Sequence, residues 1–289
     1  MHNHPEIDSI AIVIVSYNPT SNIVDLISVF DNQIPIFVID NHSTANDSKK
    51  ILNELQQKPN VELIINNSNL GIAKALNQGV VSSIQKNKKW TLLFDQDSLP
   101  NQSILESIQN CYQDVEHRDK IALIGVNYDT NASRYVKQQV ELNKKFIEID
   151  TIITSGSILN NNIYTKIGPF IDDFFIDCVD LEYGLRIIDK GYKTYFCTKV
   201  GFKHKIGELK TVSLFGLKIN STNHNVLRRY YMARNNVIIS KRYFYKYPKW
   251  VIKKNIFYLI SFLQIILVDD NKIDKIKSSL KGILNGIKN

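Results

Sequence analysis

The sequence predicts an α/β fold with a mixed, mainly parallel sheet and a group of C-terminal helices. Strand-like and helix-like segments alternate four times within residues 10–97, the pattern of a parallel sheet covered by helices. Polar residues follow each of the four apolar strands, and open α/β sheets bind ligands along that carboxyl edge. From about Tyr230 onward the pattern becomes helical and basic.

The first four strands are expected where β-branched and aromatic residues run together without charge. The residues at their carboxyl ends are Asn18, Asp40, Asn69 and Asp97. The strands are expected at Ile10–Val15, Ile34–Ile39, Val61–Ile65 and Trp90–Phe94, with helices near 22–30, 48–57 and 72–85 between them.

Asp95 and Asp97 follow the fourth strand and are the strongest candidates for chemistry. Residues i and i+2 of an extended chain point the same way, so both carboxylates can face one ligand. Hard oxygen donors of this kind suit Mg²⁺ or Mn²⁺ bound to a diphosphate. A solvated turn is the alternative for an isolated Asp-x-Asp, and the regular polar strand ends count against it.

The second half of the chain is less regular. A Gly156-Ser157 pair interrupts a strand expected over 151–159, where Gly156 allows close approach of a ligand or forms a plain bulge. Asp180 opens an acidic first helical turn, for which helix capping is the alternative to a site role. A helix over 103–112, strands over 121–126 and 192–198, and a polar connection over 131–145 complete this half.

Composition allows one to two domains and favours an anionic partner. The 289 residues carry 36 Lys and Arg against 28 Asp and Glu, a net charge of +8. The three cysteines have neither disulfide nor zinc spacing, which fits a reducing cytosol. The N-terminal residues show no secretory signal, and no apolar run reaches the roughly 20 residues that cross a bilayer.

Five motifs occur in a fixed order and together resemble a known family. They are Val15-Ser16-Tyr17-Asn18-Pro19, Asp40-Asn41-x-Ser43, Asn69-x-Gly71-x-Ala73-x-Ala75-x-Asn77-x-Gly79, Asp95-x-Asp97, and the segment from Asp180 to Arg186. Over roughly residues 9–240 the sequence resembles family 2 glycosyltransferases of the GT-A fold, a Rossmann-like fold of nucleotide-diphospho-sugar transferases. Within them it is similar to bacterial rhamnosyltransferases of O-antigen and cell-wall polysaccharide synthesis.

The resemblance implies a nucleotide pocket along the sheet edge. Ser16, Tyr17 and Asn18 would line it, and Asp40 would lie near the pyrimidine base. The segment with Asn69, Lys74 and Asn77 would cover the nucleotide and order the diphosphate, although Asn69 also suits a helix N-cap.

The resemblance also implies the metal site, the base and the sugar contacts. Asp97 would ligate the metal, Asp95 would approach the ribose or the metal, and His204 would complete the site unless it is a surface histidine. Asp180 matches the catalytic base because it stands six residues before Arg186, with Asp177 as a rival. The residues assigned to the donor and acceptor sugars are Gly156, Ser157, Glu182, Arg186 and Arg234.

These residue types suit an inverting sugar transfer. A divalent cation would stabilise the departing diphosphate, while one carboxylate removes the acceptor proton. A single base with no second carboxylate nucleophile indicates inversion of the anomeric centre. The chain departs from the family pattern at Val179-Asp180, where the usual acidic neighbour of the base is missing. It also lacks the Gln-x-x-Arg-Trp motif of processive synthases, which favours single-sugar addition.

The C-terminal region predicts a membrane-surface segment. Six basic residues and no acid occur within 241–254, interleaved with aromatic residues, and an apolar run of about 13 residues follows at 256–268, too short to span a bilayer. A helical cover for the sheet and a homodimer contact are the alternatives, and the sheet half gives no support to nucleic-acid binding. We therefore expect a GT-A domain over 1–225 and a membrane-association region over 226–289.

The sequence thus predicts a transferase that moves L-rhamnose from dTDP-β-L-rhamnose to a polyprenyl-linked glycan, with Mg²⁺ or Mn²⁺. It would act in the cytoplasm, peripherally on the inner face of the bacterial plasma membrane. The alternatives are the same fold with a UDP- or GDP-sugar, and a non-catalytic scaffold that binds a nucleotide or membrane. A sugar-1-phosphate nucleotidyltransferase would need a Gly-rich basic loop where this chain has Ser16-Tyr17-Asn18-Pro19.

Overall fold

The structure is a computed structural model that describes residues 5, 7–129, 144–203, 210–214 and 217–289. It divides into two compact units, and each is described by itself. The first unit comprises Met1–Asp173 and Tyr183–Lys205, and the second comprises Phe174–Glu182 and Ile206–Asn289. The expected domains, a glycosyltransferase domain over 1–225 and a membrane-association region over 226–289, are defined by function as well as by position in the chain. That division stays a prediction.

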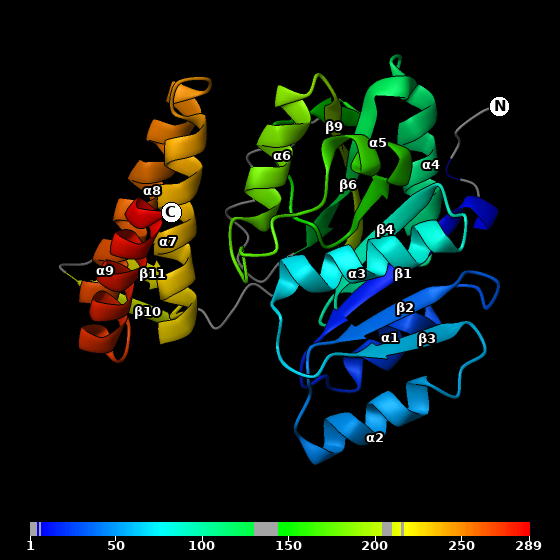
Figure 1. Ribbon diagram of the computed structural model, residues 1–289, viewed down its shortest axis with the longest axis horizontal. Coiled ribbons are helices and arrows are strands. Elements are labelled where there is room, and N and C mark those ends of the chain that lie inside the picture. The colour runs from blue at the N-terminus through cyan, green and yellow to red at the C-terminus, as the bar shows by residue number, and fades with distance from the viewer. Residues whose placement is uncertain (1–4, 6, 130–143, 204–209, 215–216) are drawn as a thin grey trace. The chain divides into compact units, whose positions relative to one another are not determined.

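The first unit is built on a mixed sheet with strand order β3-β2-β1-β4-β8-β6-β9-β5, and β7 also pairs with β9 (Figure 1). The pairs β3-β2, β2-β1, β1-β4 and β6-β9 are parallel, whereas β8 runs antiparallel to both of its neighbours. The predicted α/β fold is confirmed. The strands are β1 Ile10–Ser16, β2 Ile36–Asp40, β3 Val61–Ile65, β4 Trp90–Asp95, β5 Leu99–Pro100, β6 Ile121–Asp129, β7 Phe146–Glu148, β8 Ser157–Asn160 and β9 Lys193–Lys203.

Helices cover both faces of the parallel half. All seven residues of β1 are buried, as a strand enclosed on both faces requires. Ile12 and Ile14 belong to the core cluster that also contains Leu26 of α1 and Ile108 of α4. The helices with residues in this unit are α1 Asn22–Ser28, α2 Asn46–Leu55, α3 Ile72–Gln85, α4 Ile104–Asp114, α5 Asn161–Ile167 and α6 Val179–Asp189, and two short 3-10 helices lie at Ile7–Ser9 and Arg118–Lys120.

The opposite face of β1 receives α3 at van der Waals distance. A Cβ built on Gly79 would lie 2.3 Å from Cγ1 of Val13. Only glycine therefore fits where α3 crosses the strand, and this explains the Gly at the end of the Asn69-to-Gly79 motif. The close contact fixes α3, and with it the side chains of Lys74 and Asn77, against the centre of the sheet.

The expected strand over 151–159 is wrong in its first half. Strand β8 begins only at Ser157, because Gly156 adopts φ +74° and breaks the extended chain. A Cβ on Gly156 would lie 2.2 Å from the Phe202 ring, so the glycine is required by close approach of a side chain. The short strand β7 and the helix α5 were not predicted.

Among its described residues, the second unit contains the start of α6, a hairpin and three C-terminal helices. Strands β10 (Lys210–Leu214) and β11 (Leu217–Ser221) are antiparallel, and α7 (Val226–Tyr243), α8 (Pro248–Leu267) and α9 (Lys272–Lys288) confirm the predicted helical C-terminus. Helix α9 packs closely on α7 at two glycines, which have no side chain to hold the helices apart. Cβ atoms on Gly282 and Gly286 would lie 2.3 and 2.7 Å from the carbonyl oxygens of Tyr230 and Arg234.

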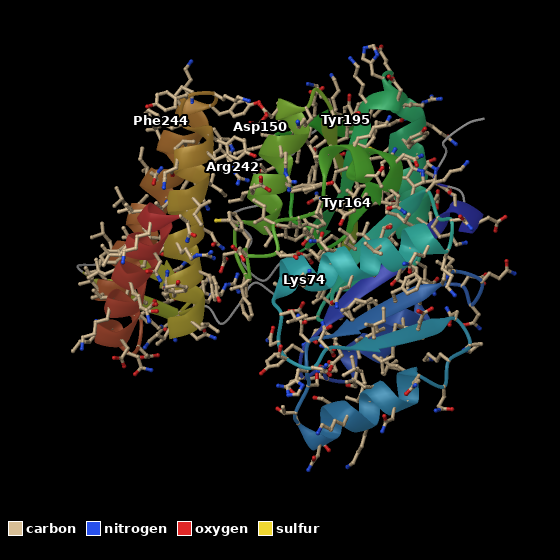
Figure 2. The ribbon with its side chains drawn as sticks, in the orientation of Figure 1. Lys74, Asp150, Tyr164, Tyr195, Arg242 and Phe244 are labelled. Carbon is tan, nitrogen blue, oxygen red and sulfur yellow. The ribbon has the colours of Figure 1, made fainter. Side chains whose placement is uncertain are left out.

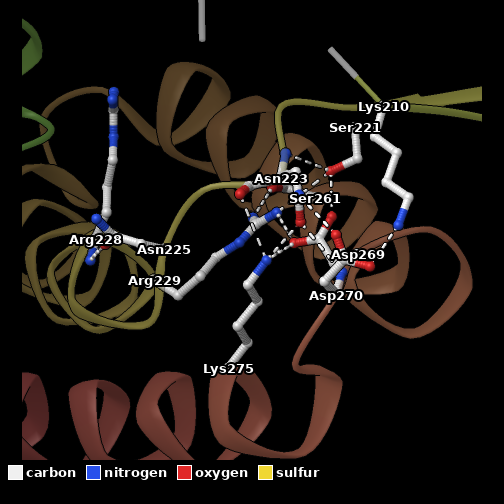
Figure 3. A network of polar contacts seen from close by, with 10 residues as sticks. All are labelled: Lys210, Ser221, Asn223, Asn225, Arg228, Arg229, Ser261, Asp269, Asp270 and Lys275. Atoms are coloured by element: carbon white, nitrogen blue, oxygen red, sulfur yellow. Dashed lines mark hydrogen bonds and ion pairs between the residues drawn. The ribbon is translucent and has the colours of Figure 1, made fainter. Parts of the chain in front are cut away.

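A buried ionic cluster joins these helices to the hairpin (Figure 3). The Asp269 carboxylate accepts hydrogen bonds from Arg229 at 2.8 Å and from Lys275 at 3.1 Å, and all three side chains are at most 4% exposed. Burial alone would raise the pKa of Asp269, but the hydrogen bonds from Ser221, Arg229 and Lys275 hold that pKa below its usual range. Loss of one partner from such a cluster leaves a buried charge uncompensated, which typically costs about 3–5 kcal/mol.

Helix α8 is longer than the apolar run that the sequence suggested. Its 20 residues pass the length and composition required of a membrane span, the one helix to do so within the described residues, so the expectation that no segment is long enough was wrong. Soluble proteins also contain helices that pass this test, but those are mostly buried. Only Val251 and Ile265 of α8 are buried.

Candidate functional site

The carboxyl ends of β1 and β2 form a hydrogen-bonded corner. Asn18 has a left-handed backbone, with φ 48°, and its side-chain oxygen accepts the backbone N–H groups of Thr44 at 2.9 Å and Ala45 at 3.1 Å. Its own N–H donates to the Ser43 hydroxyl at 2.7 Å. The Asn18 side chain therefore orders the loop that leads into α2, whereas the neighbouring Tyr17 side chain is 47% exposed.

Asp40 is directed into the protein. It is 1% exposed, and its carboxylate accepts hydrogen bonds from the backbone N–H and hydroxyl of Ser43. The Ser16 hydroxyl also donates to it, at 3.4 Å. Asp40 thus fixes the turn after β2, and any influence on a bound base would pass through the shape of that turn.

Asp95 and Asp97 lie at the end of β4, but strand alternation does not align them. The strand ends at Asp95, and Gln96 and Asp97 form a turn closed by the Ser98 N–H, which donates to the Asp95 carbonyl at 3.1 Å. The premise that an extended chain points both carboxylates the same way is therefore wrong beyond Asp95. Both aspartates are partly exposed.

Gln96 holds this turn against the end of β1. Its side-chain oxygen accepts the Tyr17 N–H at 2.8 Å, and its amide nitrogen donates to the Tyr17 carbonyl at 3.0 Å. From the other side, the Asp95 N–H donates to the Ser155 hydroxyl at 3.1 Å. The role of Gln96 was not predicted, although the residue lies between the two candidate aspartates in the sequence.

The start of α3 is shaped by Asn69 and Gly71. The Asn69 side-chain oxygen accepts the Gly71 N–H at 3.0 Å, and Gly71 has φ +84°, a backbone conformation that L residues rarely adopt. Asn41 donates to the Gly71 carbonyl at 3.1 Å. The turn before α3 is thereby tied to the turn after β2.

Asn77 is the centre of a polar network that the sequence did not reveal. Its amide nitrogen donates to the Phe170 carbonyl at 2.8 Å and to the Asp172 carboxylate at 2.7 Å, while its oxygen accepts from the Phe170 N–H at 2.9 Å and the Tyr164 hydroxyl at 2.8 Å. Lys74, one turn earlier on α3 (Figure 2), donates to the same Asp172 at 2.5 Å. Asp172 was missed because only the fold brings it to α3.

The segment that carries the predicted base belongs to the second unit. Asp177 and Cys178 both have φ 65°, a left-handed conformation in two consecutive non-glycine residues. The Asp177 carboxylate accepts two hydrogen bonds from Arg228 of α7, at 2.9 and 3.1 Å. Asp177 is thus committed to an ion pair, which favours Asp180 over its rival as the base.

Asp180 lies in the first turn of α6 and is partly exposed. Its carboxylate accepts the N–H of Leu181 at 2.9 Å. Burial raises the pKa of Asp180 above its usual range, and the like charge of Asp177 acts in the same direction, whereas the Leu181 N–H and the Lys254 ammonium oppose the rise. A carboxylate with a raised pKa accepts a proton more readily than an ordinary aspartate.

The sugar candidates lie in different surroundings. Glu182 is 1% exposed and accepts hydrogen bonds from Arg242 and Tyr243 at 3.0 Å each, which favours a structural role over a sugar contact. Gly156 and Ser157 are buried, Arg186 stacks over the Tyr183 ring at 5.0 Å, and Arg234 lies on α7.

Within the described residues, no group of three or more His, Cys, Asp or Glu side chains could hold a metal ion. His204, the predicted third ligand, lies outside the described residues. The two other predicted metal ligands, Asp95 and Asp97, belong to the first unit. The predicted base, Asp180, belongs to the second.

Comparisons with known proteins agree with this fold. A family described as Glycosyl transferase family 2 matches residues 11–176. The dTDP-rhamnosyl transferase RfbF of Shigella flexneri is 30% identical, over 96% of this chain and 94% of that protein. Among solved structures, S. aureus TarS aligns with a TM-score of 0.54 at 15% identity, over 96% of this chain and 43% of TarS.

The mannosyltransferase PcManGT from Pyrobaculum calidifontis, solved with GDP-Man and Mn²⁺, aligns with a TM-score of 0.60 at 12% identity, over 98% of this chain and 76% of that one. At these identities the solved structures show the shared fold, and this chain spans less than half the length of TarS.

Fold and sequence together define a glycosyltransferase of the GT-A class. The chain belongs to glycosyl transferase family 2, as its motifs indicated, and its similarity to RfbF supports the rhamnosyltransferase-like group within that family.

The Asn77 network makes a prediction about stability. Asn77→Leu keeps the side-chain volume but leaves the buried Phe170 and Tyr164 groups without their partner, so we expect the free energy of unfolding to fall by about 2–4 kcal/mol. Guanidinium unfolding measures the change. Lys74→Gln is the control, because its exposed ion pair with Asp172 contributes at most about 1 kcal/mol. Equal effects of the two substitutions would contradict the central role of Asn77.

Proposed function

We propose that the protein is an inverting glycosyltransferase that moves L-rhamnose from dTDP-β-L-rhamnose to a glycan acceptor in bacterial surface polysaccharide synthesis. One observation carries the donor assignment: the relative named a dTDP-rhamnosyl transferase is 30% identical and matches this chain over nearly the full length of both proteins. The family match supports the reaction class independently.

The diphosphate end of the donor is proposed to bind at the turn after β4. Asp95 and Asp97 offer hard oxygen donors that suit Mg²⁺ or Mn²⁺, and the two Gln96 hydrogen bonds to Tyr17 keep their turn in place. His204 is the proposed third ligand. The cation would stabilise negative charge on the departing diphosphate. The presence of Mn²⁺ in the PcManGT structure supports this assignment by analogy of fold.

The nucleotide is proposed to lie along the carboxyl ends of β1, β2 and the turn before α3. Tyr17 is an exposed aromatic residue of this edge and suits stacking or edge contact with the base. Ser16, Asn18, Asp40 and Asn69 would act through the loops that their hydrogen bonds fix. Lys74 and Asn77 would act from α3, with Asp172 as their shared partner.

The acceptor hydroxyl is proposed to lose its proton to Asp180. A base that acts once, on the face opposite the leaving group, gives inversion at the anomeric carbon. The raised pKa of Asp180 supports this assignment. Gly156, Ser157, Arg186 and Arg234 are the proposed neighbours of the two sugars.

The donor is tested with purified protein, Mn²⁺ and a panel of nucleotide sugars, by measuring released nucleoside diphosphate. We expect dTDP-rhamnose to give the highest rate, and Asp97→Asn to lower that rate by at least about 100-fold because several kcal/mol of charge stabilisation are lost. Asp47→Asn, an exposed aspartate on α2, is the control. Preference for a UDP- or GDP-sugar would refute the rhamnose assignment alone, and no release from any donor would favour the non-catalytic scaffold.

The base is tested by the pH dependence of kcat. Because the pKa of Asp180 is raised and the base must be unprotonated, kcat should fall on acidification at a higher pH than an ordinary aspartate would give. Lys254 opposes the rise, so Lys254→Met should move the acidic limb to still higher pH. Lys249→Met, an exposed lysine on the same helix, should leave it in place. An acidic limb that does not respond to Lys254→Met would contradict the assignment of Asp180.

The acceptor is proposed to be polyprenyl-linked, with the enzyme peripheral on the inner face of the plasma membrane. The exposed apolar residues of α8 support this, since they recur at helical spacing along one stripe and lie beside exposed lysines. The members of the stripe are Ile252, Ile256, Leu259, Ile260, Leu263, Ile266 and Leu267.

Membrane binding is tested by sedimentation with vesicles. We expect the protein to bind vesicles rich in anionic phosphatidylglycerol and to bind zwitterionic vesicles less, because lysines attract the anionic surface. Replacing Ile256, Leu259 and Leu263 by serine should abolish binding without unfolding the protein, since these side chains are already exposed. If the stripe is a homodimer contact instead, the wild-type protein will be dimeric without lipid, the triple variant monomeric, and neither will bind vesicles.

A further inference from the structure

The segment before Asp180 has a strained backbone conformation that neighbouring residues must stabilise. Asp177 and Cys178 are consecutive non-glycine residues at φ 65°, and the second has no side-chain amide or carboxylate that favours this conformation. Such a pair persists only when its surroundings determine it. Asp180 follows two residues later, so the backbone at these positions sets where its carboxylate points.

Asn235 of α7 binds the carbonyl groups at this point. Its amide nitrogen donates to the Ile176 carbonyl at 3.0 Å and to the Asp177 carbonyl at 2.9 Å. The side chain is fully buried, with 0% exposure, so water cannot easily replace it. Without this amide, two carbonyl groups would lose a partner beside the strained residues.

Two further residues on the same face of α7 bind the same segment. Tyr231 stacks on the Phe175 ring, with centroids 4.9 Å apart and planes at 15°. Arg228 makes the paired hydrogen bonds to the Asp177 carboxylate. Residues 228, 231 and 235 are spaced by three and four, so they form one stripe along the helix. We call Arg228, Tyr231 and Asn235 the α7 stripe.

We propose that the α7 stripe is a positioning device for the catalytic base. Its three members bind the ring, the backbone and the carboxylate of consecutive residues 175–177, and thereby fix the direction in which α6 begins. The proposal rests on the proposed role of Asp180. It also gives a role to Asn235, which ends the sequence Tyr231-Met232-Ala233-Arg234-Asn235 and acts as a positioning residue that needs no contact with substrate.

Two neighbouring asparagines allow a matched test. Asn235→Ala removes the hydrogen bonds to the segment before the base. Asn236→Ala removes an equally buried amide, 3% exposed, which donates instead to Asn255 of α8 at 2.9 Å. We expect Asn235→Ala to lower kcat for sugar transfer by about 100-fold, the effect of a misplaced reacting group, with the donor KM little changed. Asn236→Ala should keep kcat near the wild-type value.

Two other residues provide a test that holds even if Asn235→Ala fails to fold. Arg228→Gln removes the ion pair with Asp177 at a partly exposed position and should also lower kcat while leaving the donor KM. Tyr231→Phe keeps the stacked ring and should retain activity, whereas Tyr231→Ala should lose it.

Hydrogen exchange measured by mass spectrometry gives a readout separate from activity. Backbone amides of residues 174–182 should exchange faster in Asn235→Ala than in Asn236→Ala. Equal kcat and equal exchange in these two variants, with an active wild-type protein, would overturn the α7 stripe alone. A wild-type protein that transfers no sugar would overturn the proposed function, and the catalytic role of the stripe with it.

Discussion

The enclosure of β1 on both faces is the constraint on which the first unit depends. Ile12 and Ile14 pack into the cluster shared by α1 and α4, and Val13 meets α3 where only Gly79 fits. Since β2 and β4 pair in parallel on either side of this strand, their carboxyl ends reach one edge together. The hydrophobic strand therefore decides where the polar turns with Asn18, Asp40 and Asp97 must lie.

The sequence sufficed for the parts of the fold whose signals are local. Each of the first four strands is a short apolar run followed by turn residues, and each helix between them shows apolar residues at helical spacing. The antiparallel β8 could not be predicted, because its pairing with β4 and β6 depends on residues far away in the chain. Gly156 was noticed as a place of close approach, but its partner, the Phe202 ring, is visible only in the folded chain.

The candidate site shows the same division. Polar residues at strand ends were found from their position, and the family motifs gave them roles that stay predictions. Sequence could not show that the carboxylate of Asp40 turns inward to Ser43, or that Asn77 binds Phe170 and Asp172. The sequence does not show whether an amide or carboxylate side chain stabilises a loop or binds a ligand. Its hydrogen-bond partners in the folded protein distinguish these two roles.

The second unit is discontinuous in sequence, since Phe174–Glu182 belongs with the C-terminal helices. Recombination between homologous genes that exchanges only the DNA for residues 206–289 would place a foreign α7 against the parental residues 175–177. Arginine, tyrosine and asparagine at the matching helix positions would then have to be shared by both parents. Chimeric enzymes assembled to alter acceptor choice should therefore carry residues 174–182 and the C-terminal helices from one source.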